Sequence, residues 1–258
     1  MFPIAHAWLI RQLTADVSPA HMLGCIWPDM LFESPLTHPQ SHRSGARLAV
    51  FAADPAGPGS ETFHQFVMGV LSHGSEPHGF DWYSDEQYGD RAPEDKGFAF
   101  QRALPLASAA ARACDVDARD GWWKAHNLVE MAFEHTLHRT YPELGEALTQ
   151  ACGSDGLIRD ISVPLARFYG VPAEALAHAM RRFTDVSALK PASPADLARV
   201  YALQVRIKHP GAVPDERAIA GLIDYATDEI ADERDSYLAH CVSEVRALVN
   251  RDTGEQPS

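Results

Sequence analysis

Apolar residues recur along most of the chain at the spacing of an α-helix, and no segment alternates as a strand would. In residues 3–14, Ile4, Trp8 and Leu9 fall on one face, and a proline suits the first turn. Comparable patterns predict helices at 19–27, 46–52, 61–73, 100–114, 120–139, 173–183, 194–208 and 215–249, the last interrupted near Asp232. Polar, proline-rich and glycine-rich stretches predict loops at 31–45 and 74–99. The expected fold class is all-α.

The length of 258 residues, of which 46% are hydrophobic, is sufficient for a large helical core. We expect residues 1–140 to form a metal-binding helical core and residues 141–258 to pack on it as a C-terminal helical region of one continuous domain. No apolar run approaches the roughly 20 residues of a membrane span. We find no secretion signal, and the four cysteines are too far apart to suggest a disulfide framework or a cysteine zinc site. These features predict a cytoplasmic protein of unspecified oligomeric state.

The chain is acidic, with 22 basic and 35 acidic side chains and a formal net charge of −13. Such a surface repels nucleic acid at long range, so a nucleic-acid partner is not expected. A small phosphorylated substrate is still compatible with this charge, because bound metal ions can reverse the local field.

Histidine is the most informative residue type, because 13 histidines are present and most precede residue 140. His126 and Glu130 are four residues apart on a predicted helix, so both can reach one metal ion. A surface pair at this spacing is the alternative. His135 lies roughly opposite His126 on the same helix, which favours a position outside the site.

Two further segments carry ligand-type residues. Gly69 to His73 ends an apolar helix, with His78 and Asp81 following within reach. Asp29 follows a proline between apolar segments, where a buried carboxylate needs a cation or a metal ion. The alternatives are a histidine at a helix C-terminus and a carboxylate that caps a short turn.

His38 and His42 share a predicted loop, and His6 lies on the apolar first helix. Solvated loop histidines and a satisfied core histidine are the respective alternatives. His64 should not join the site, because it lies nearly opposite His73 on its helix.

The order of these motifs resembles the zinc-dependent phospholipase C family, which is structurally related to the P1/S1 nucleases. The resemblance covers residues 4 to about 140. Its motifs are His6-Ala7-Trp8-Leu9-Ile10, Gly24-Cys25-Ile26-Trp27-Pro28-Asp29, His42, the G-x-x-x-H from Gly69 to His73 and the H-x-x-x-E from His126 to Glu130. It implies an all-helical phospholipase C/P1 nuclease-like bundle, here with additional C-terminal helices, and two or three zinc ions, with iron or manganese as other possible metals.

Carried over by position, the resemblance implies metal ligation by His6, Asp29, His42, His73, His126 and Glu130. The family has an aspartate four residues after the histidine that matches His73, but this chain has Pro77 there. Glu76, His78 or Asp81 could replace it. Family members with a third zinc bind it through a processed N-terminal amino group, whereas this chain starts Met1-Phe2, so two ions are the favoured expectation.

A two-metal site of histidines and carboxylates suits hydrolysis of a phosphate ester. We therefore expect a metal-dependent phosphoester hydrolase, with Asp29, Glu76 and His78 as candidate catalytic residues. One rival is a di-iron or mixed-metal enzyme. The other is a helical partner-binding protein with a structural or vestigial metal site. In it the cations Arg199, Arg206 and Lys208 could meet an acidic partner, with a solvated helix face as the default alternative.

Overall fold

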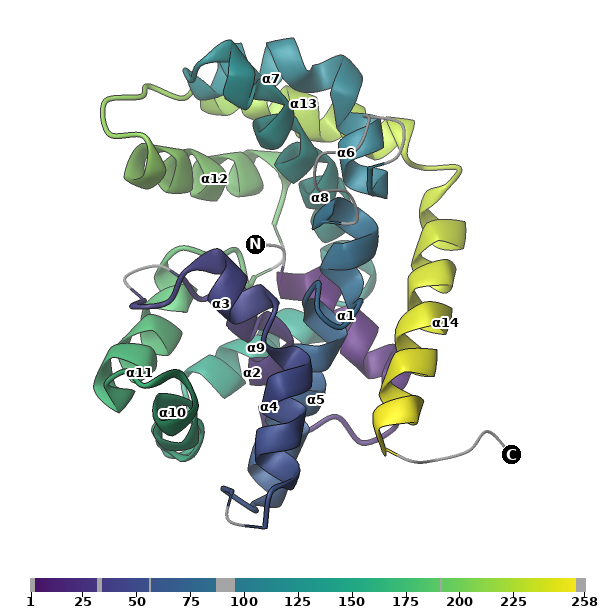
Figure 1. The fold of residues 1–258 in the computed structure, drawn as a ribbon. Coiled ribbons are helices and arrows are strands. Elements are labelled where there is room, and N and C mark those ends of the chain that lie inside the picture. The colour runs from purple at the N-terminus through teal and green to yellow at the C-terminus, as the bar shows by residue number, and fades with distance from the viewer. Residues whose placement is uncertain (1–2, 32–33, 56, 87–95, 191, 254–258) are drawn as a thin grey trace.

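The computed structural model describes residues 3–31, 34–55, 57–86, 96–190 and 192–253. Over these ranges the fold is all-α, with 14 α-helices and no strands (Figure 1). Among the described residues, no helix is both long enough and apolar enough to cross a bilayer. All four cysteines are buried and unpaired with one another.

The N-terminal half contains eight α-helices and the short turns between them. Its helices are α1 (Pro3–Leu13), α2 (Pro19–Ile26), α3 (His38–His42), α4 (Gly45–Ala53), α5 (Glu61–His73), α6 (Phe98–Ala103), α7 (Ala107–Cys114) and α8 (Gly121–Thr140). Its described turns are the 3-10 segments η1 (Trp27–Asp29), η4 (Leu104–Leu106) and η5 (Ala118–Asp120) and the π-helical turn η2 (Trp82–Glu86).

Six further helices form the C-terminal half, and their ends follow local sequence signals. They are α9 (Glu143–Cys152), α10 (Asp155–Tyr169), α11 (Ala173–Arg182), α12 (Pro194–Lys208), α13 (Glu216–Glu229) and α14 (Arg234–Thr253), with the 3-10 turn η6 (Phe183–Asp185). Ser193 caps α12 reciprocally with Asp196. Gly170 ends α10 in a left-handed conformation, with φ of 70°.

Three expectations from the sequence need correction. Residues 31–45 are not all loop, because Thr37 and Gln40 form a capping box that begins α3. The predicted helix at 100–114 is divided by the 3-10 turn η4, where Pro105 cannot donate a helical hydrogen bond. The predicted loop at 74–99 contains η2, whereas residues 87–95 lie outside the described ranges.

One continuous cluster of buried apolar side chains extends from Ile4 to Val249. In Figure 1, α7, α12 and α13 lie in the upper part of the molecule, and α3, α10 and α11 lie in the lower part. The helix α8 packs against α1 at one side and against α7 and α13 at the other. The two halves of the chain therefore share one core, and α8 connects the upper and lower parts.

Candidate metal centre

Five side chains, each from a different part of the chain, meet in what we call the first group: His6, Asp29, His42, His73 and Asp81. The His73 Nε2 atom lies 3.1 Å from Asp81 Oδ2 and 3.9 Å from Asp29 Oδ2. The His42 Nε2 atom lies 3.4 Å from Asp29 Oδ1 and 3.3 Å from Asp81 Oδ2. His6 Nε2 lies 3.4 Å from Asp81 Oδ1, and its ring stacks on that of His73. The ligand-type atoms of this group are close enough to share metal ions.

Close packing of α2 on α5 explains the position of His73. A Cβ at Gly24 would lie 2.0 Å from the Phe66 carbonyl oxygen, and one at Gly69 would lie 2.5 Å from the His21 carbonyl oxygen. Only glycine therefore allows this approach of the two backbones. At this short separation, His73 Nδ1 donates a hydrogen bond of 2.6 Å to the Cys25 carbonyl oxygen. Its Nε2 is then left to face the two carboxylates, as in many histidine metal ligands.

A second backbone contact fixes His42 beside Asp29. Ser41 in α3 donates a hydrogen bond of 2.9 Å to the carbonyl oxygen of Pro28 in η1. The Nδ1 atom of His42 lies 3.2 Å from the His38 carbonyl oxygen, which accepts its proton. This arrangement again directs Nε2 toward the carboxylates.

The buried carboxylate of Glu134 holds the start of α1, and with it His6. Its oxygens accept hydrogen bonds from the backbone N–H groups of Ile4 (3.1 Å) and Ala5 (2.7 Å). The first turn of a helix leaves such N–H groups without intrahelical partners, so Glu134 acts as a cap from another helix. Glu134 lies one helical turn after Glu130 on α8. These hydrogen bonds therefore fix α1 against the helix that also carries His126 and Glu130.

The second group consists of Asp85, His126 and Glu130, whose ligand-type atoms lie within 4.8 Å of one another. His126 Nε2 is 3.9 Å from Glu130 Oε2, as expected for residues four apart on α8. Ser84 donates a hydrogen bond of 2.6 Å to Glu130 Oε1. The His126 ring is held between Phe100, on which it stacks at 4.2 Å, and Trp123.

Asp81 and Asp85 come from adjacent turns of one short helical segment that ends in the π-helical turn η2. Residues four apart on such a segment share a face, so one aspartate can serve each group. The segment between α5 and α6 thereby connects the two groups. Single π-helical turns are frequent at functional sites.

Burial and neighbouring charges shift the pKa values of these side chains in ways that suit ligation. Burial lowers the pKa values of His6 and His126 to about 3, so both rings are neutral at pH 7. Burial raises the pKa of Glu130 to about 7. Burial alone would lower the pKa of His73, but the Asp81 and Asp29 carboxylates and the hydrogen bond to Cys25 together outweigh it and raise the pKa to about 9. Burial opposes ionisation of Asp81, yet His73, His6 and His42 together lower its pKa below the usual range.

Two buried nitrogens test whether these residues fit a metal ion. Among the described residues, neither His6 Nδ1 nor His73 Nε2 has a partner in hydrogen-bonding geometry, although Asp81 lies close to His73. A buried polar atom without a hydrogen bond is costly, and a cation bound at His73 Nε2, which faces the carboxylates, would remove that cost there. Imidazole and carboxylate donors suit zinc, iron and manganese. The donor set therefore fits a transition metal, and its identity is open.

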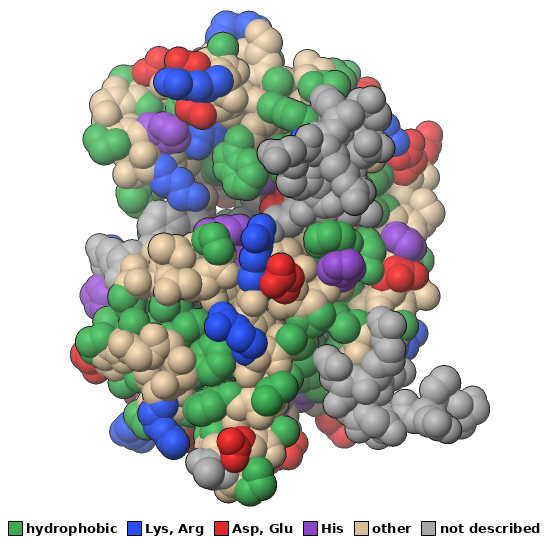
Figure 2. Space-filling view, viewed as in Figure 1, with side chains coloured by type: hydrophobic (Ala, Val, Ile, Leu, Met, Phe, Trp, Pro, Cys, Tyr) green, Lys and Arg blue, Asp and Glu red, His purple; other side chains and the backbone are tan. Residues whose placement is uncertain are grey.

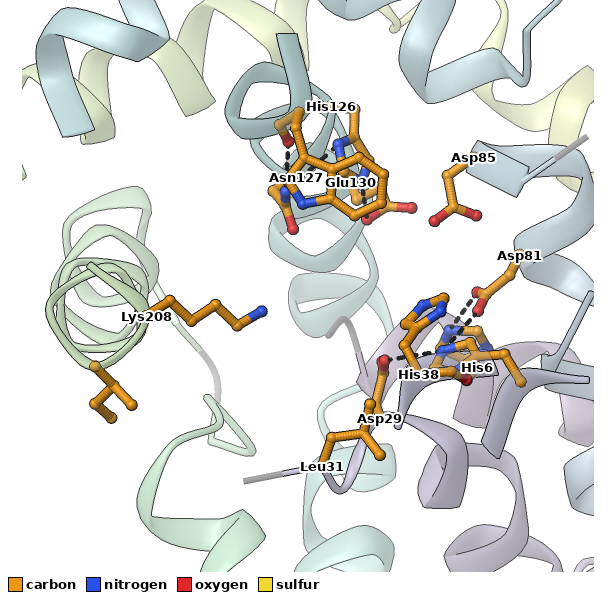
Figure 3. Close-up of a pocket in the computed structure, with 13 residues that line it drawn as sticks. His6, Asp29, Leu31, His38, Asp81, Asp85, His126, Asn127, Glu130 and Lys208 are labelled. Atoms are coloured by element: carbon orange, nitrogen blue, oxygen red, sulfur yellow. Dashed lines mark hydrogen bonds and ion pairs between the residues drawn. The ribbon is translucent and has the colours of Figure 1, made fainter. Parts of the chain in front are cut away.

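Both groups line a single cavity of about 530 Å³, between the part of the molecule that contains α12 and the part that contains α3 (Figure 2). Figure 3 shows Asp29, His6 and Asp81 on one side, with His126 and Glu130 nearby and Asp85 beside them. Lys208 projects toward them from the opposite wall (Figure 3). Leu31, Trp123 and Ile207 supply apolar surface. The cavity can thus admit a small molecule to the candidate ligand residues.

The structure brings together seven of the eight predicted ligands: His6, Asp29, His42, His73, Asp81, His126 and Glu130. The exception is His78, which is exposed and stacks on Trp82 at 3.6 Å. Glu76 is also exposed, and neither residue lines the cavity. We therefore exclude Glu76 and His78 from the site, because the chain turns at Pro77 and directs both outward. Asp81 is the residue that faces the first-group histidines.

His64 and His135 lie outside the site, as their helical positions predict. His64 is exposed, and His135 faces the Ala192 carbonyl oxygen. Sequence reasoning missed Asp85, although its spacing of four from Asp81 was a usable signal. It also missed that Lys208 lines the cavity. The other two cations of the predicted stripe form ion pairs, Arg199 with Asp196 and Arg206 with Glu216.

Comparisons of the chain with protein-family models, with curated proteins and with solved structures gave no match. The functional argument therefore rests on the geometry of the two groups and on the cavity they line.

Proposed function

We propose that this protein is a metal-dependent hydrolase of a small phosphate ester. The observation that carries the proposal is that two histidine–carboxylate groups, built from distant parts of the chain, open into one cavity. A structural metal site is usually closed, whereas a catalytic site leaves room for water and substrate. The cavity supports the catalytic reading over the structural one.

Divalent ions held by such a pair of groups would lower the pKa of bound water and offset the charge of a phosphate. The protein's own residues hold the ligand geometry. His73 and His42 are oriented by backbone carbonyl oxygens, and Asp81 faces three histidines of the first group. Preorganisation of this kind reduces the structural change that the reaction requires.

Asp29 is the carboxylate that we place nearest to the chemistry. It lines the cavity from the end of η1, is partly accessible, and directs its two oxygens toward His42 and His73. It can therefore act as a ligand and position the attacking water. Asp85 and Glu130 present a second pair of carboxylates at the other group.

The resemblance to the zinc-dependent phospholipase C family agrees with this proposal. The motifs that carry it supply most of both groups, and zinc is accordingly the first metal to test. The acidic chain favours a small phosphorylated molecule over nucleic acid as the substrate.

The test combines metal analysis with activity. We expect the purified protein to hold at least two equivalents of transition metal and to hydrolyse a generic phosphodiester or monoester. The variants Asp29→Asn and His126→Ala should each lose metal and activity, whereas His64→Ala, on the exposed side of α5, should keep both. Chelation should abolish activity, and added zinc should restore it.

Two results would overturn the proposal. A protein that binds no metal lacks the required centre. A protein that holds metal tightly, unfolds when chelated and is inactive across both ester classes has a structural site, as in the partner-binding alternative. Iron with a redox-dependent activity would instead favour the di-iron or mixed-metal reading.

A further inference from the structure

The cavity has two unlike walls, and the second comes partly from the C-terminal half of the chain. One wall carries the two metal-ligand groups. The other includes Ile207 and Lys208 at the end of α12, near Trp123 on α8. The motifs in residues 4–140 do not extend to α12, so this wall has to be interpreted from its own chemistry.

Lys208 is the only lysine or arginine among the described residues that line the cavity. Its side chain extends from the last turn of α12 across the cavity, toward the face that carries Asp29 and Glu130 (Figure 3). Arg206, on the same helix, does not line the cavity and bonds to Glu216 at 3.0 Å. Lys208 is therefore the cation that meets whatever enters the cavity.

The surface between Lys208 and the metal-ligand groups is partly apolar. Trp123 and Ile207, which line the cavity, each keep 47% of their surface exposed. Contacts with Phe100 and His126 hold the Trp123 ring in place. Exposed apolar surface in a concave site commonly marks contact with a ligand.

The charged groups that line the cavity favour an anionic ligand once metal is bound. Four carboxylates line it, from Asp29, Asp81, Asp85 and Glu130. Two divalent ions would balance these four charges, and Lys208 then presents a cationic group at the opposite wall. The volume of about 530 Å³ lies within the range of small-molecule sites and has room for more than a phosphate group.

We propose that Lys208 binds a second anionic group of the substrate, on the opposite side of the cavity from the phosphate ester. The substrate class is then a phosphate ester whose alcohol part is apolar or aromatic and ends in a carboxylate or another phosphate. Trp123 and Ile207 contact the apolar part. This inference rests on the proposed function, because it assumes that the phosphate ester lies at the metal-ligand groups.

The experiment measures binding of phosphonates, which cannot be hydrolysed, to the zinc-loaded full chain by titration calorimetry. Phenylphosphonate is compared with analogues that carry a carboxylate directly on the ring or on a two-carbon chain. The readout is the ratio of their dissociation constants. It is measured for the native protein, for Lys208→Gln and Lys208→Glu, and for Lys190→Gln, an exposed lysine away from the cavity.

We expect the native protein and Lys190→Gln to prefer at least one carboxylated analogue. Lys208→Gln should reduce this preference by about tenfold, the effect of one charge-assisted hydrogen bond. Lys208→Glu should reverse it. Three results would each overturn the inference. The ratio of dissociation constants could be equal in the native protein and Lys208→Gln, the native protein could show no preference between the analogues, or it could bind no phosphonate at all.

The two proposals fail in different ways. If Lys208 determines the binding preference but the matching phosphate esters are not cleaved, the hydrolase assignment fails and the anion site stands. If esters are cleaved without any dependence of binding preference on Lys208, the hydrolase stands and this inference fails.

Discussion

The His73 Nε2 atom and the Asp81 Oδ2 atom lie 3.1 Å apart, with no hydrogen bond of acceptable geometry between them. The two residues are separated by the turn that contains Pro77. This nitrogen and oxygen form the centre of the first group, because the same Asp81 oxygen also lies 3.3 Å from His42 Nε2. We propose Asp81 as the replacement for the aspartate that the resemblance led us to expect at position 77.

Replacing Asp81 by asparagine should therefore remove metal from the first group. The amide keeps the size of the side chain but loses the negative charge that faces His6, His42 and His73. We expect metal affinity to fall by more than the roughly 10–100-fold typical of outer-shell substitutions. Metal content after dialysis against a graded chelator series is the measurement.

Glu76→Gln provides the matched control for Asp81→Asn, since Glu76 is an exposed carboxylate on the same connection. It should retain native metal content and activity. If Glu76→Gln lost activity with its metal intact, the exclusion of Glu76 from the site would be wrong.

Gly69→Ala should displace His73 without changing any ligand. The added Cβ would lie 2.5 Å from the His21 carbonyl oxygen and 2.6 Å from the Cys25 nitrogen, so α2 and α5 must separate. The hydrogen bond from His73 to Cys25 would then lengthen. We expect a loss of about 1–3 kcal/mol in the free energy of unfolding, as for other overpacked cores, together with weaker metal binding. Chemical denaturation and metal titration measure the two effects.

The control for this variant is Gly221→Ala on α13, where an added Cβ meets no atom within 4 Å. Alanine there should leave metal binding unchanged and stabilise the helix by about 0.5–1 kcal/mol. Native stability and metal affinity in Gly69→Ala would contradict the role assigned to the close contact between α2 and α5.

Most of the helices could be predicted from the sequence because their signals are local. Ser60 caps α5 and Ser193 caps α12, and the predicted spans at 61–73 and 194–208 are those observed. The errors occur where an element is too short to show a periodic pattern or where a proline interrupts one. The turn α3 has only five residues, too short for a periodic pattern to emerge, and Pro105 divides a segment whose apolar pattern is continuous.

The candidate ligands could be found from residue type and spacing, but their grouping could not. His126 and Glu130 share a helix, so their proximity follows from the helical repeat. The proximity of Asp29 to His42 depends on the Ser41–Pro28 hydrogen bond, a tertiary contact with no local signature. The outward direction of His78 depends likewise on how the chain turns after α5. The same limit applies to Lys208, which reaches the cavity only through the packing of α12.

Glu134→Leu should weaken metal binding at the first group, although Glu134 is not one of its proposed ligands. The variant leaves the N–H groups of Ile4 and Ala5 buried without acceptors, each at a cost of about 1–3 kcal/mol. The start of α1 should then loosen and carry His6 away from Asp81. Hydrogen exchange of the α1 amides, measured beside metal affinity, tests this link.

Glu134→Gln is the matched variant, because the amide keeps one acceptor oxygen and nearly the same shape. Its effects on exchange and on metal affinity should both be smaller than those of Glu134→Leu. Unchanged metal affinity in Glu134→Leu, despite faster exchange at α1, would remove His6 from the required ligands.

The metal-free protein should lose stability as the pH rises from 7 to 9. The pKa of His73 is raised to about 9 by Asp81, against the effect of burial, and burial raises the pKa of Glu134 to about 8. A group with a raised folded-state pKa contributes its full stabilisation below its unfolded pKa and loses it as the pH rises through the folded value. The stabilisation from His73 is lost between about pH 6.5 and about pH 9. The stabilisation from Glu134 is lost between about pH 4.5 and about pH 8, so the last part of this loss falls above pH 7.

Bound metal should flatten this dependence, because ligation already requires the unprotonated form of His73. Metal affinity should accordingly rise with pH toward 9, while the chelated protein becomes easier to unfold. Thermal unfolding at pH 7, 8 and 9, with chelator and with zinc, provides the comparison. A chelated protein whose melting temperature is constant over this range would show that the His73–Asp81 contact does not hold a proton in the absence of metal.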